Sequence, residues 1–282
     1  MPGSPASPAK LTEESGYLPS PAGPIYCTTY RPDGGRAKPD AAVLLLGAFA
    51  EERKSSTTAM VVMARAFARE GIASARIDFR GTGDSGGSSR NLSFASMVDD
   101  TAAACGALPG ELGCGKIILA GVRLGASVAV LSAHRLKSRL RALVLMEPVV
   151  SGDVYARELS RKQAIRRMLT KDAGDAAVCE QDGVYDLDGI ALDGCFMDSL
   201  SKVDLAAHVN DEGGEPGLPV HVLQIGARKK LRKDVAALRD ALGQTAQAAV
   251  LVAEPFWLQT DYVDPQPAVD AVVPFLKGAL QD

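Results

Sequence analysis

The patterns that would mark a metal site or a disulfide framework are missing from this sequence. Its five cysteines are an odd number and lie far apart, with no CxxC pair and without the His and Cys spacing that zinc requires. Scattered cysteines of this kind are typical of reduced thiols inside a cell. We therefore expect a cytoplasmic protein that holds no metal.

Long apolar segments and an excess of one charge are missing as well. No apolar run approaches the roughly 20 residues that a membrane span requires, and the N-terminus has no apolar signal segment. The 31 basic and 34 acidic residues give a formal net charge of -3, which leaves no overall field to attract nucleic acid or an anionic membrane. The sequence predicts neither a membrane span nor a nucleic-acid partner.

The glycine motifs of nucleotide-binding folds are also missing. Neither GxGxxG nor GxxxxGK(S/T) follows a predicted strand anywhere in the chain. Without such a motif the sequence does not favour a dinucleotide site of the Rossmann type. We expect no cofactor.

The chain is long enough for one α/β domain. Its 282 residues, of which 46% are hydrophobic, can bury a continuous core. Residues 1–15 are rich in Pro, Ser and Ala, and they are predicted to form a disordered tail. The domain is expected to span residues 16–282.

From Ala42 onward, short apolar runs alternate with segments of helical period. This alternation is typical of a buried parallel sheet with helices on both faces. A hairpin precedes it, so the sequence predicts a mostly parallel sheet of eight strands. The predicted strands are 16–18, 25–30, 42–46, 73–78, 116–120, 142–146, 220–226 and 248–252.

The alternation is interrupted once, between Met146 and Val220, for a stretch too long for a simple crossover. We interpret it as a cap of about residues 150–217, inserted after the sixth strand. Such a cap would cover the carboxyl ends of the strands, where open α/β proteins bind ligands. Its predicted parts are a basic helical stretch at 155–169, a polar loop, a hairpin at 184–192 turning near Gly189, and an amphipathic segment at 196–205.

Two segments indicate the α/β-hydrolase fold. The strand 116–120 runs into Gly121-Val122-Arg123-Leu124-Gly125-Ala126 and then a helix, which is the layout of the nucleophile elbow GxSxG. Residues 76–85, RIDFRGTGDS, are similar to the loop after the fourth strand in many α/β-hydrolases. Arg123, however, stands where the nucleophilic serine belongs.

The chain resembles the α/β-hydrolase-fold proteins called exosortase A system-associated hydrolase 2. The resemblance implies a role beside bacterial exopolysaccharide production and exosortase-dependent protein sorting, with components of those systems as partners. The word hydrolase in that name reflects the fold, and a fold alone does not establish a reaction. The matching pieces are Phe49-Ala50-Glu51-Glu52, the serine-free elbow at 121–126, the stretch around Val184 to Leu200, and Pro255-Phe256-Trp257.

The three catalytic roles of a serine hydrolase are unfilled in the sequence. Arginine stays protonated at physiological pH and is neither a nucleophile nor a base. The triad histidine follows the last strand in this fold, but His134, His208 and His221 all come earlier. After Gly226, where the acid is expected, basic residues follow and Asp234 is the first carboxylate. Standard serine-hydrolase activity is therefore not expected.

Arg123 is expected to project from the elbow into the pocket. There it either binds a carboxylate, phosphate or sulfate of a ligand, or is neutralised by a carboxylate of its own chain. The candidates are Glu51 and Glu52, placed on the loop after the strand 42–46, and Glu147, placed at the end of the strand 142–146, because these strand ends border the same pocket in this fold. The predicted pocket residues are Arg123, Leu124, Ala48, Phe49, Glu51, Glu52, Glu147 and Trp257.

Three functions are consistent with these patterns. The first is a non-catalytic binding or accessory protein that holds a small anionic ligand in the hydrolase pocket. The second is a genuine, esterase-like hydrolase with a non-standard arrangement, such as a water activated by a glutamate. The third is a protein-interaction scaffold that uses the cap surface. A closed pocket favours the scaffold, whereas an open pocket with a paired arginine and carboxylate favours either of the first two.

Overall fold

The computed structural model of the chain describes residues 11–33, 39–170, 184–187, 189–258 and 262–281. The strands of the large sheet are β1 (Leu11–Leu18), β2 (Ile25–Pro32), β3 (Ala41–Leu46), β4 (Ser74–Ile77), β5 (Lys116–Val122), β6 (Leu140–Met146), β9 (Val220–Gly226) and β10 (Ala246–Val252). The helices beside it are α1 (Ala50–Arg69), α2 (Phe94–Leu112), α3 (Leu124–Leu136), α7 (Lys233–Leu242) and α8 (Gln266–Gln281), with two short 3-10 helices, η1 (Ser89–Asn91) and η2 (Lys137–Arg139).

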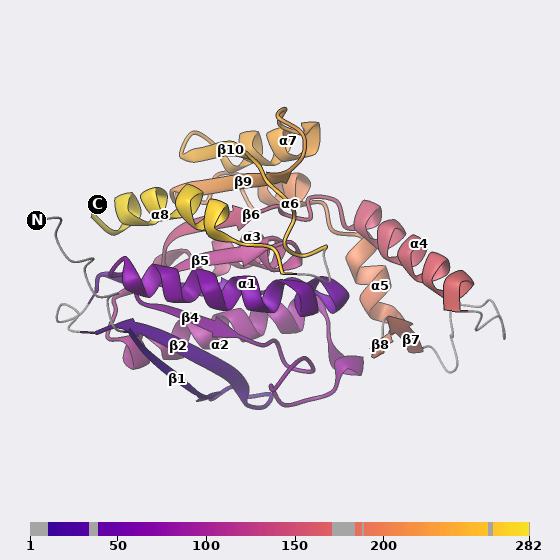
Figure 1. Cartoon of the computed structure of the whole chain (residues 1–282), viewed down its shortest axis with the longest axis horizontal. Helices are drawn as coiled ribbons and strands as arrows, with labels where there is room; N and C mark the ends of the chain where they lie inside the picture. Colours follow the sequence, from indigo (N-terminus) through magenta and orange to yellow (C-terminus); the bar gives the residue numbers. More distant parts are fainter. Residues whose placement is uncertain (1–10, 34–38, 171–183, 188, 259–261, 282) are drawn as a thin grey trace, which may run out of the picture.

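The large sheet is mostly parallel, as predicted. Its strands lie in the order β1-β2-β4-β3-β5-β6-β9-β10 (Figure 1). The pairs β1·β2 and β2·β4 are antiparallel, and the other neighbouring pairs are parallel. Parallel strands end at the same edge of a sheet, so the loops after β3, β5, β6, β9 and β10 come together there.

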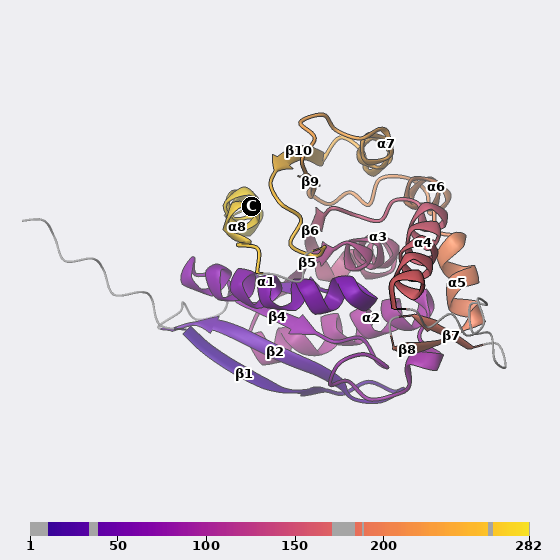
Figure 2. The same cartoon turned by 45° about the vertical axis from the view of Figure 1, so that its right-hand side comes forward.

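Helices cover both faces of the sheet (Figure 2). α1 and α8 lie on one face, and α2, α3 and α7 lie on the other. Successive strand residues point to opposite faces of the sheet. Leu45 therefore packs in the core on the side of α1 and α8, while Leu44 and Leu46 pack in the core on the side of α2, α3 and α7. Within the described residues, no helix combines the length and the apolar composition needed to cross a membrane.

The segment between β6 and β9 begins with α4 (Gly152–Thr170) and continues with the antiparallel hairpin β7 (Val184–Leu187) and β8 (Ile190–Asp193). The hairpin turns at Gly189, as predicted from the sequence. The predicted amphipathic segment is divided between α5 (Gly194–Ser201) and α6 (Leu205–Asp211), because Asp204 caps α6 by accepting a hydrogen bond from the Ala207 N–H at 3.0 Å. α4 and α5 lie beyond one end of the sheet (Figure 1). The predicted polar loop lies outside the described residues.

Two sequence predictions are wrong at element boundaries. The tail predicted at 1–15 overlaps β1, which pairs with β2 from Leu11 onward. The polar residues of this exposed edge strand show no apolar alternation, and backbone hydrogen bonds place them in the sheet. Glu51 and Glu52, predicted on a loop, lie in the first turn of α1, where the helix dipole favours acidic side chains.

Candidate functional site

Three strained residues lie at the carboxyl edge of the sheet. Ala50, Arg123 and Glu147 are the non-glycine residues of the described chain with positive φ, at 51°, 54° and 46°. They follow β3, β5 and β6. Strain of this kind persists only where the surrounding structure enforces it, and it concentrates at functional sites. The candidate site therefore lies between these three connections.

Arg123 occupies the sharp turn between β5 and α3. Its backbone N–H donates to the Met146 carbonyl oxygen at 3.0 Å. Close packing requires glycine on both sides of it. A Cβ on Gly121 would lie 2.3 Å from backbone atoms of α3, and one on Gly125 would lie 2.2 Å from the Leu46 carbonyl oxygen. The elbow of the fold is thus built, although its central residue is an arginine.

The guanidinium of Arg123 forms a bidentate ion pair with Glu52. Its Nε and Nη2 donate to the two carboxylate oxygens, each at 3.1 Å. The Arg123 side chain is 11% exposed and that of Glu52 is 4% exposed, so both charges are largely removed from water. Burial lowers the pKa of Arg123, but the Glu52 carboxylate outweighs this effect and holds the pKa above its usual value. Of the three candidate glutamates, Glu52 is therefore the internal partner.

Tyr155 and Trp257 enclose this ion pair. The Tyr155 hydroxyl, on α4, donates to Glu52 Oε2 at 2.9 Å. The Arg123 Cζ lies 5.3 Å from the centre of the Tyr155 ring and 5.6 Å from that of Trp257, which follows β10. Contacts at these distances attract the cation to both rings. Burial and the nearby Glu52 carboxylate raise the pKa of Tyr155 well above its usual value, so the phenol stays a proton donor.

Glu147 belongs to a second ion pair. Its carboxylate accepts hydrogen bonds from Arg232 Nη1 and, through Oε2, from the Ile225 backbone N–H at 2.7 Å. Arg232 Nε also lies 3.1 Å from Asp234 Oδ1, in the first turn of α7. Arg123 contacts the backbone of Glu147, because Arg123 Nη1 lies 3.5 Å from the Glu147 carbonyl oxygen. Its side chain is thus committed to Arg232.

A cavity of about 660 Å³ opens beside Arg123. This volume lies within the range of small-molecule sites. Of the predicted pocket residues, Arg123, Glu147 and Trp257 line it, together with Tyr155 and Arg232. The structure therefore brings three of the eight predicted residues together with residues of α4 and of the loop after β9.

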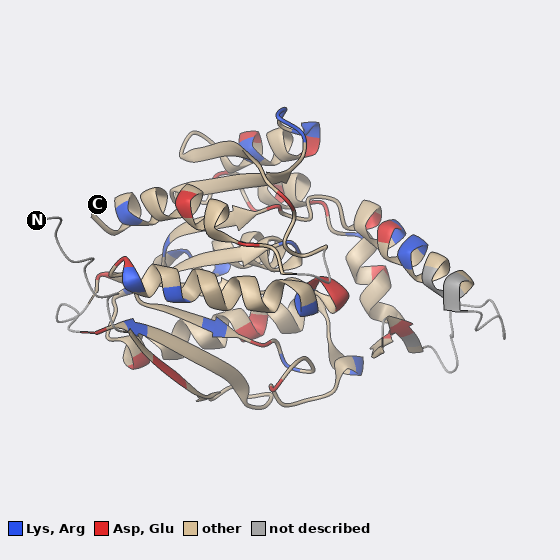
Figure 3. Cartoon of the chain, in the orientation of Figure 1, with Lys and Arg blue, Asp and Glu red and all other residues tan. Residues whose placement is uncertain are grey.

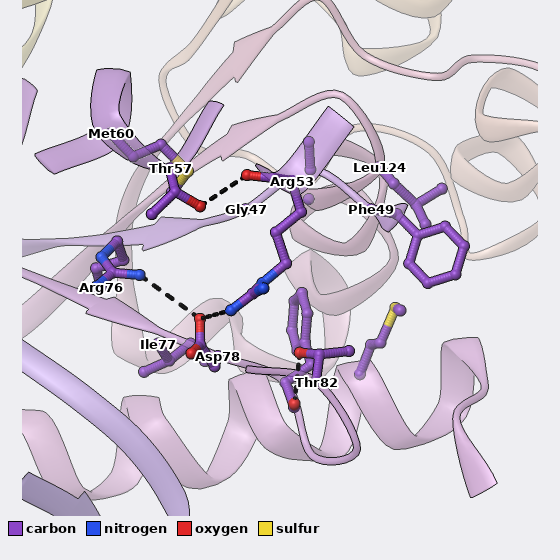
Figure 4. A pocket seen from close by; sticks show the side chains of 14 residues that line it. Gly47, Phe49, Arg53, Thr57, Met60, Arg76, Ile77, Asp78, Thr82 and Leu124 are labelled. Atoms are coloured by element: carbon purple, nitrogen blue, oxygen red, sulfur yellow. Dashed lines mark hydrogen bonds and ion pairs between the residues drawn. The ribbon is translucent and has the colours of Figure 1, made fainter. Parts of the chain in front are cut away.

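Three more of the predicted residues lie around a different and much smaller cavity. Ala48, Phe49 and Leu124 line a space of about 20 Å³, enough for about one water molecule (Figure 4). Asp78 also lines it and pairs with Arg53 Nη2 at 3.0 Å. Glu51 and Glu52 are not among the described residues that line either cavity. The predicted pocket is thus divided in two.

No histidine is found among the described residues that line the two cavities. His134 Nε2 lies 2.9 Å from the Gly214 carbonyl oxygen, and His221 stacks on Phe275 near the amino end of β9. The connection after β10, where the triad histidine belongs in this fold, brings Trp257 to the cavity instead.

Sequence reasoning missed Tyr155, Lys162 and Arg232. Lys162 Nζ, on α4, lies 3.9 Å from Glu52 Oε1. Tyr155 and Glu52 are 103 positions apart, so no local spacing relates them. The basic character of the stretch 155–169 and the cluster of basic residues after Gly226 were the available signals for Lys162 and Arg232.

Several solved structures share this fold. Est1E from Butyrivibrio proteoclasticus matches with a TM-score of 0.65 at 14% identity, covering 95% of this chain and 99% of that one. A hypothetical protein from Pseudomonas aeruginosa matches with a TM-score of 0.69 at 17% identity, covering 96% and 94%. The esterase Pf2001 from Pyrococcus furiosus matches with a TM-score of 0.64 at 16% identity, covering 95% and 91%. These likenesses confirm the predicted α/β-hydrolase fold.

Comparison with curated proteins finds no significant match. The model of the Hydrolase_4 family, described as serine aminopeptidase, S33, matches residues 37–185, slightly more than half of the chain. The matched region contains the elbow, Glu52 and α4. The chain therefore belongs to the serine aminopeptidase S33 family, within the α/β-hydrolase fold.

Proposed function

We propose that this chain is a family member without serine-hydrolase activity that binds a small anionic ligand in the cavity beside Arg123. One observation carries the proposal. The buried guanidinium of Arg123, hydrogen-bonded to Glu52, stands at the elbow and also lines a cavity of about 660 Å³. The strained backbone of the elbow is retained at Arg123. Retained strain without a nucleophile supports a binding role.

The lack of acyl transfer follows from the chemistry of Arg123. Covalent catalysis on this fold needs a nucleophile in hydrogen-bond contact with a base. The guanidinium has no lone pair to offer to either role. The residue of the connection after β10 that contacts Arg123 is Trp257, whose indole ring can act neither as an acid nor as a base.

The contacts of the two nearby glutamates do not favour a glutamate-activated water. The oxygens of Glu52 already accept hydrogen bonds from Arg123 and Tyr155. Those of Glu147 accept from Arg232 and from a backbone N–H of β9. A general base needs a lone pair directed at its water, and both carboxylates already direct acceptor sites at charged, hydroxyl or backbone donors of the protein.

The guanidinium keeps donors for a ligand. Glu52 takes the N–H groups of the Nε and Nη2 edge, which leaves the Nη1 group and the second Nη2 hydrogen. The contact of Nη1 with the Glu147 carbonyl oxygen, at 3.5 Å, is long for a hydrogen bond and easily exchanged. Est1E, a structural neighbour, has been solved with ferulic acid bound, which is a carboxylic acid. A carboxylate of this kind is a suitable group for the free edge.

An open cavity favours ligand binding over a pure scaffold. Val154 and Leu258 line its wall, and they are 48% and 53% exposed, so the cavity opens to solvent.

On the resemblance to the exosortase-associated proteins, we also propose that the protein acts beside exopolysaccharide production and exosortase-dependent sorting. A deletion strain with normal exopolysaccharide secretion and normal sorting of exosortase substrates would contradict that role.

The main proposal is tested on the purified chain with two measurements. Fluorophosphonate probes and p-nitrophenyl esters should give no labelling and no acylation burst, because no hydroxyl occupies the elbow. A panel of acetate, phosphate, sulfate and longer carboxylates should contain at least one ligand, detected through Trp257, the only tryptophan of the chain. Binding should weaken in Arg123→Lys, which keeps the charge but loses the fork of N–H donors. Stoichiometric serine labelling, or a panel without any ligand, would refute the proposal.

A further inference from the structure

Acids match or outnumber the bases around the large cavity. Arg123 is neutralised by Glu52, and Arg232 by Glu147. On α4, basic and acidic residues lie side by side (Figure 3). Glu52 lies behind the wall and adds a fourth acid to the three bases and three acids among the described lining residues. Those six are Arg123, Lys162, Arg232, Glu147, Glu158 and Asp234. No surplus of positive charge is left for a doubly charged anion such as phosphate. The free-energy cost of removing such an anion from water would therefore not be offset in the cavity.

One planar acceptor still fits the Arg123 guanidinium. Its free donors on Nη1 and Nη2 form a fork that matches the two oxygens of a carboxylate. A single delocalised negative charge adds less repulsion against Glu52 and Glu147 than a divalent group does. The head group favoured by this geometry is therefore one carboxylate.

Apart from its charged residues, the wall of the cavity is mostly apolar. Val149, Val150 and Ile225 are buried in it, at 4%, 6% and 4% exposed. Val154 and Leu258 line the same cavity but are about half exposed, at 48% and 53%. Apolar side chains left open to water beside a cavity are a surface that a ligand can cover. A volume of about 660 Å³ is far larger than a carboxylate alone requires.

From these observations we infer that the ligand is an amphipathic monocarboxylic acid. Its carboxylate binds the free edge of Arg123, and its hydrocarbon body lies along Val149, Val150 and Ile225 toward Val154 and Leu258. This inference rests on the proposed function and narrows its ligand from an anion in general to one head group joined to an apolar tail.

The test uses the full chain and four probes: decanoate, decanol, acetate and inorganic phosphate. Trp257 fluorescence reports binding at the cavity, because no other tryptophan exists in the chain. Decanoate should bind at least about tenfold more tightly than each of the other three, since only it supplies both the charge and the apolar surface. Decanol matching decanoate would overturn the role of the carboxylate. Acetate or phosphate matching it would overturn the role of the apolar wall.

Leu258→Ser is the variant of choice, because its side chain is 53% exposed and its loss leaves the core intact. It should weaken decanoate about five- to tenfold. The matched control is Val252→Ser, at a residue 52% exposed that is not among those lining the cavity, and it should bind decanoate as the parent chain does. Equal affinities of both variants and the parent would overturn the inference. Phosphate binding that is lost in Arg123→Lys would refute only the narrower inference, because Arg123 would then bind a small anion without an apolar body. If none of the four probes binds, both the inference and the proposed function are refuted.

Discussion

Replacing Arg123 by Met removes the guanidinium but keeps a side chain of similar reach, and it should destabilise the fold by about 3 kcal/mol. The reason is that the partner carboxylate, Glu52, is 4% exposed and would lose two hydrogen bonds of 3.1 Å. Breaking a buried pair typically costs about 3 to 5 kcal/mol. The lower end applies here, because Tyr155 and Lys162 remain near the Glu52 oxygens.

A double-mutant cycle with Glu52→Gln measures the pair itself. Denaturant melts of the two single variants and of the double variant should show a coupling of about 1 to 3 kcal/mol. Pairing Arg123→Met with Glu147→Gln should give less than about 0.5 kcal/mol, because that change keeps the backbone carbonyl that Arg123 contacts. The exposed pair Arg135 and Asp99, at 58% and 55% exposed, serves as a control.

The control pair should couple by less than about 1 kcal/mol, since surface ion pairs are largely screened. Coupling of Arg123 with Glu52 that is no larger than this would refute the reasoning. It would mean that the buried geometry contributes nothing beyond a surface contact. A larger coupling with Glu147 than with Glu52 would refute the assignment of the partner.

Three further predictions concern the same chain. Arg123→Ser should not create an esterase with ordinary turnover, on the order of 10 per second, because no histidine is among the described residues that line the cavity beside the elbow; p-nitrophenyl ester assays check this. Tyr155→Phe should lower stability by about 1.5 to 3 kcal/mol, seen as a shifted denaturant midpoint, because it removes a buried hydrogen bond to the charged Glu52. Burial lowers the pKa of His221 below its usual 6.5, so the unfolded chain takes up this proton first. Stability should therefore be full above about pH 6.5 and fall below it, with a smaller fall in His221→Leu, as thermal melts between about pH 8 and 5 would show.

Local patterns were sufficient for the main elements of the fold. Apolar runs such as 117–120 form buried strands because both faces of the sheet are covered, so every side chain in the run must be apolar. They identified only the end of β1, at 16–18, and were insufficient for residues 11–15, whose mostly exposed side chains carry no such signal. The place of these residues is decided by backbone hydrogen bonds to β2, which any sequence of suitable conformation can form.

The sequence by itself determined that the elbow holds Arg123 and that no histidine follows the last strand, because chain order alone establishes both facts. Only the tertiary structure decided that Glu52 pairs with Arg123. Successive residues of a helix point about 100° apart, so the start of α1 at Ala50 selects which glutamate faces inward. Tyr155 joins the pair from a helix 103 positions away, and such a contact is decided by how elements pack in space and not by spacing along the chain.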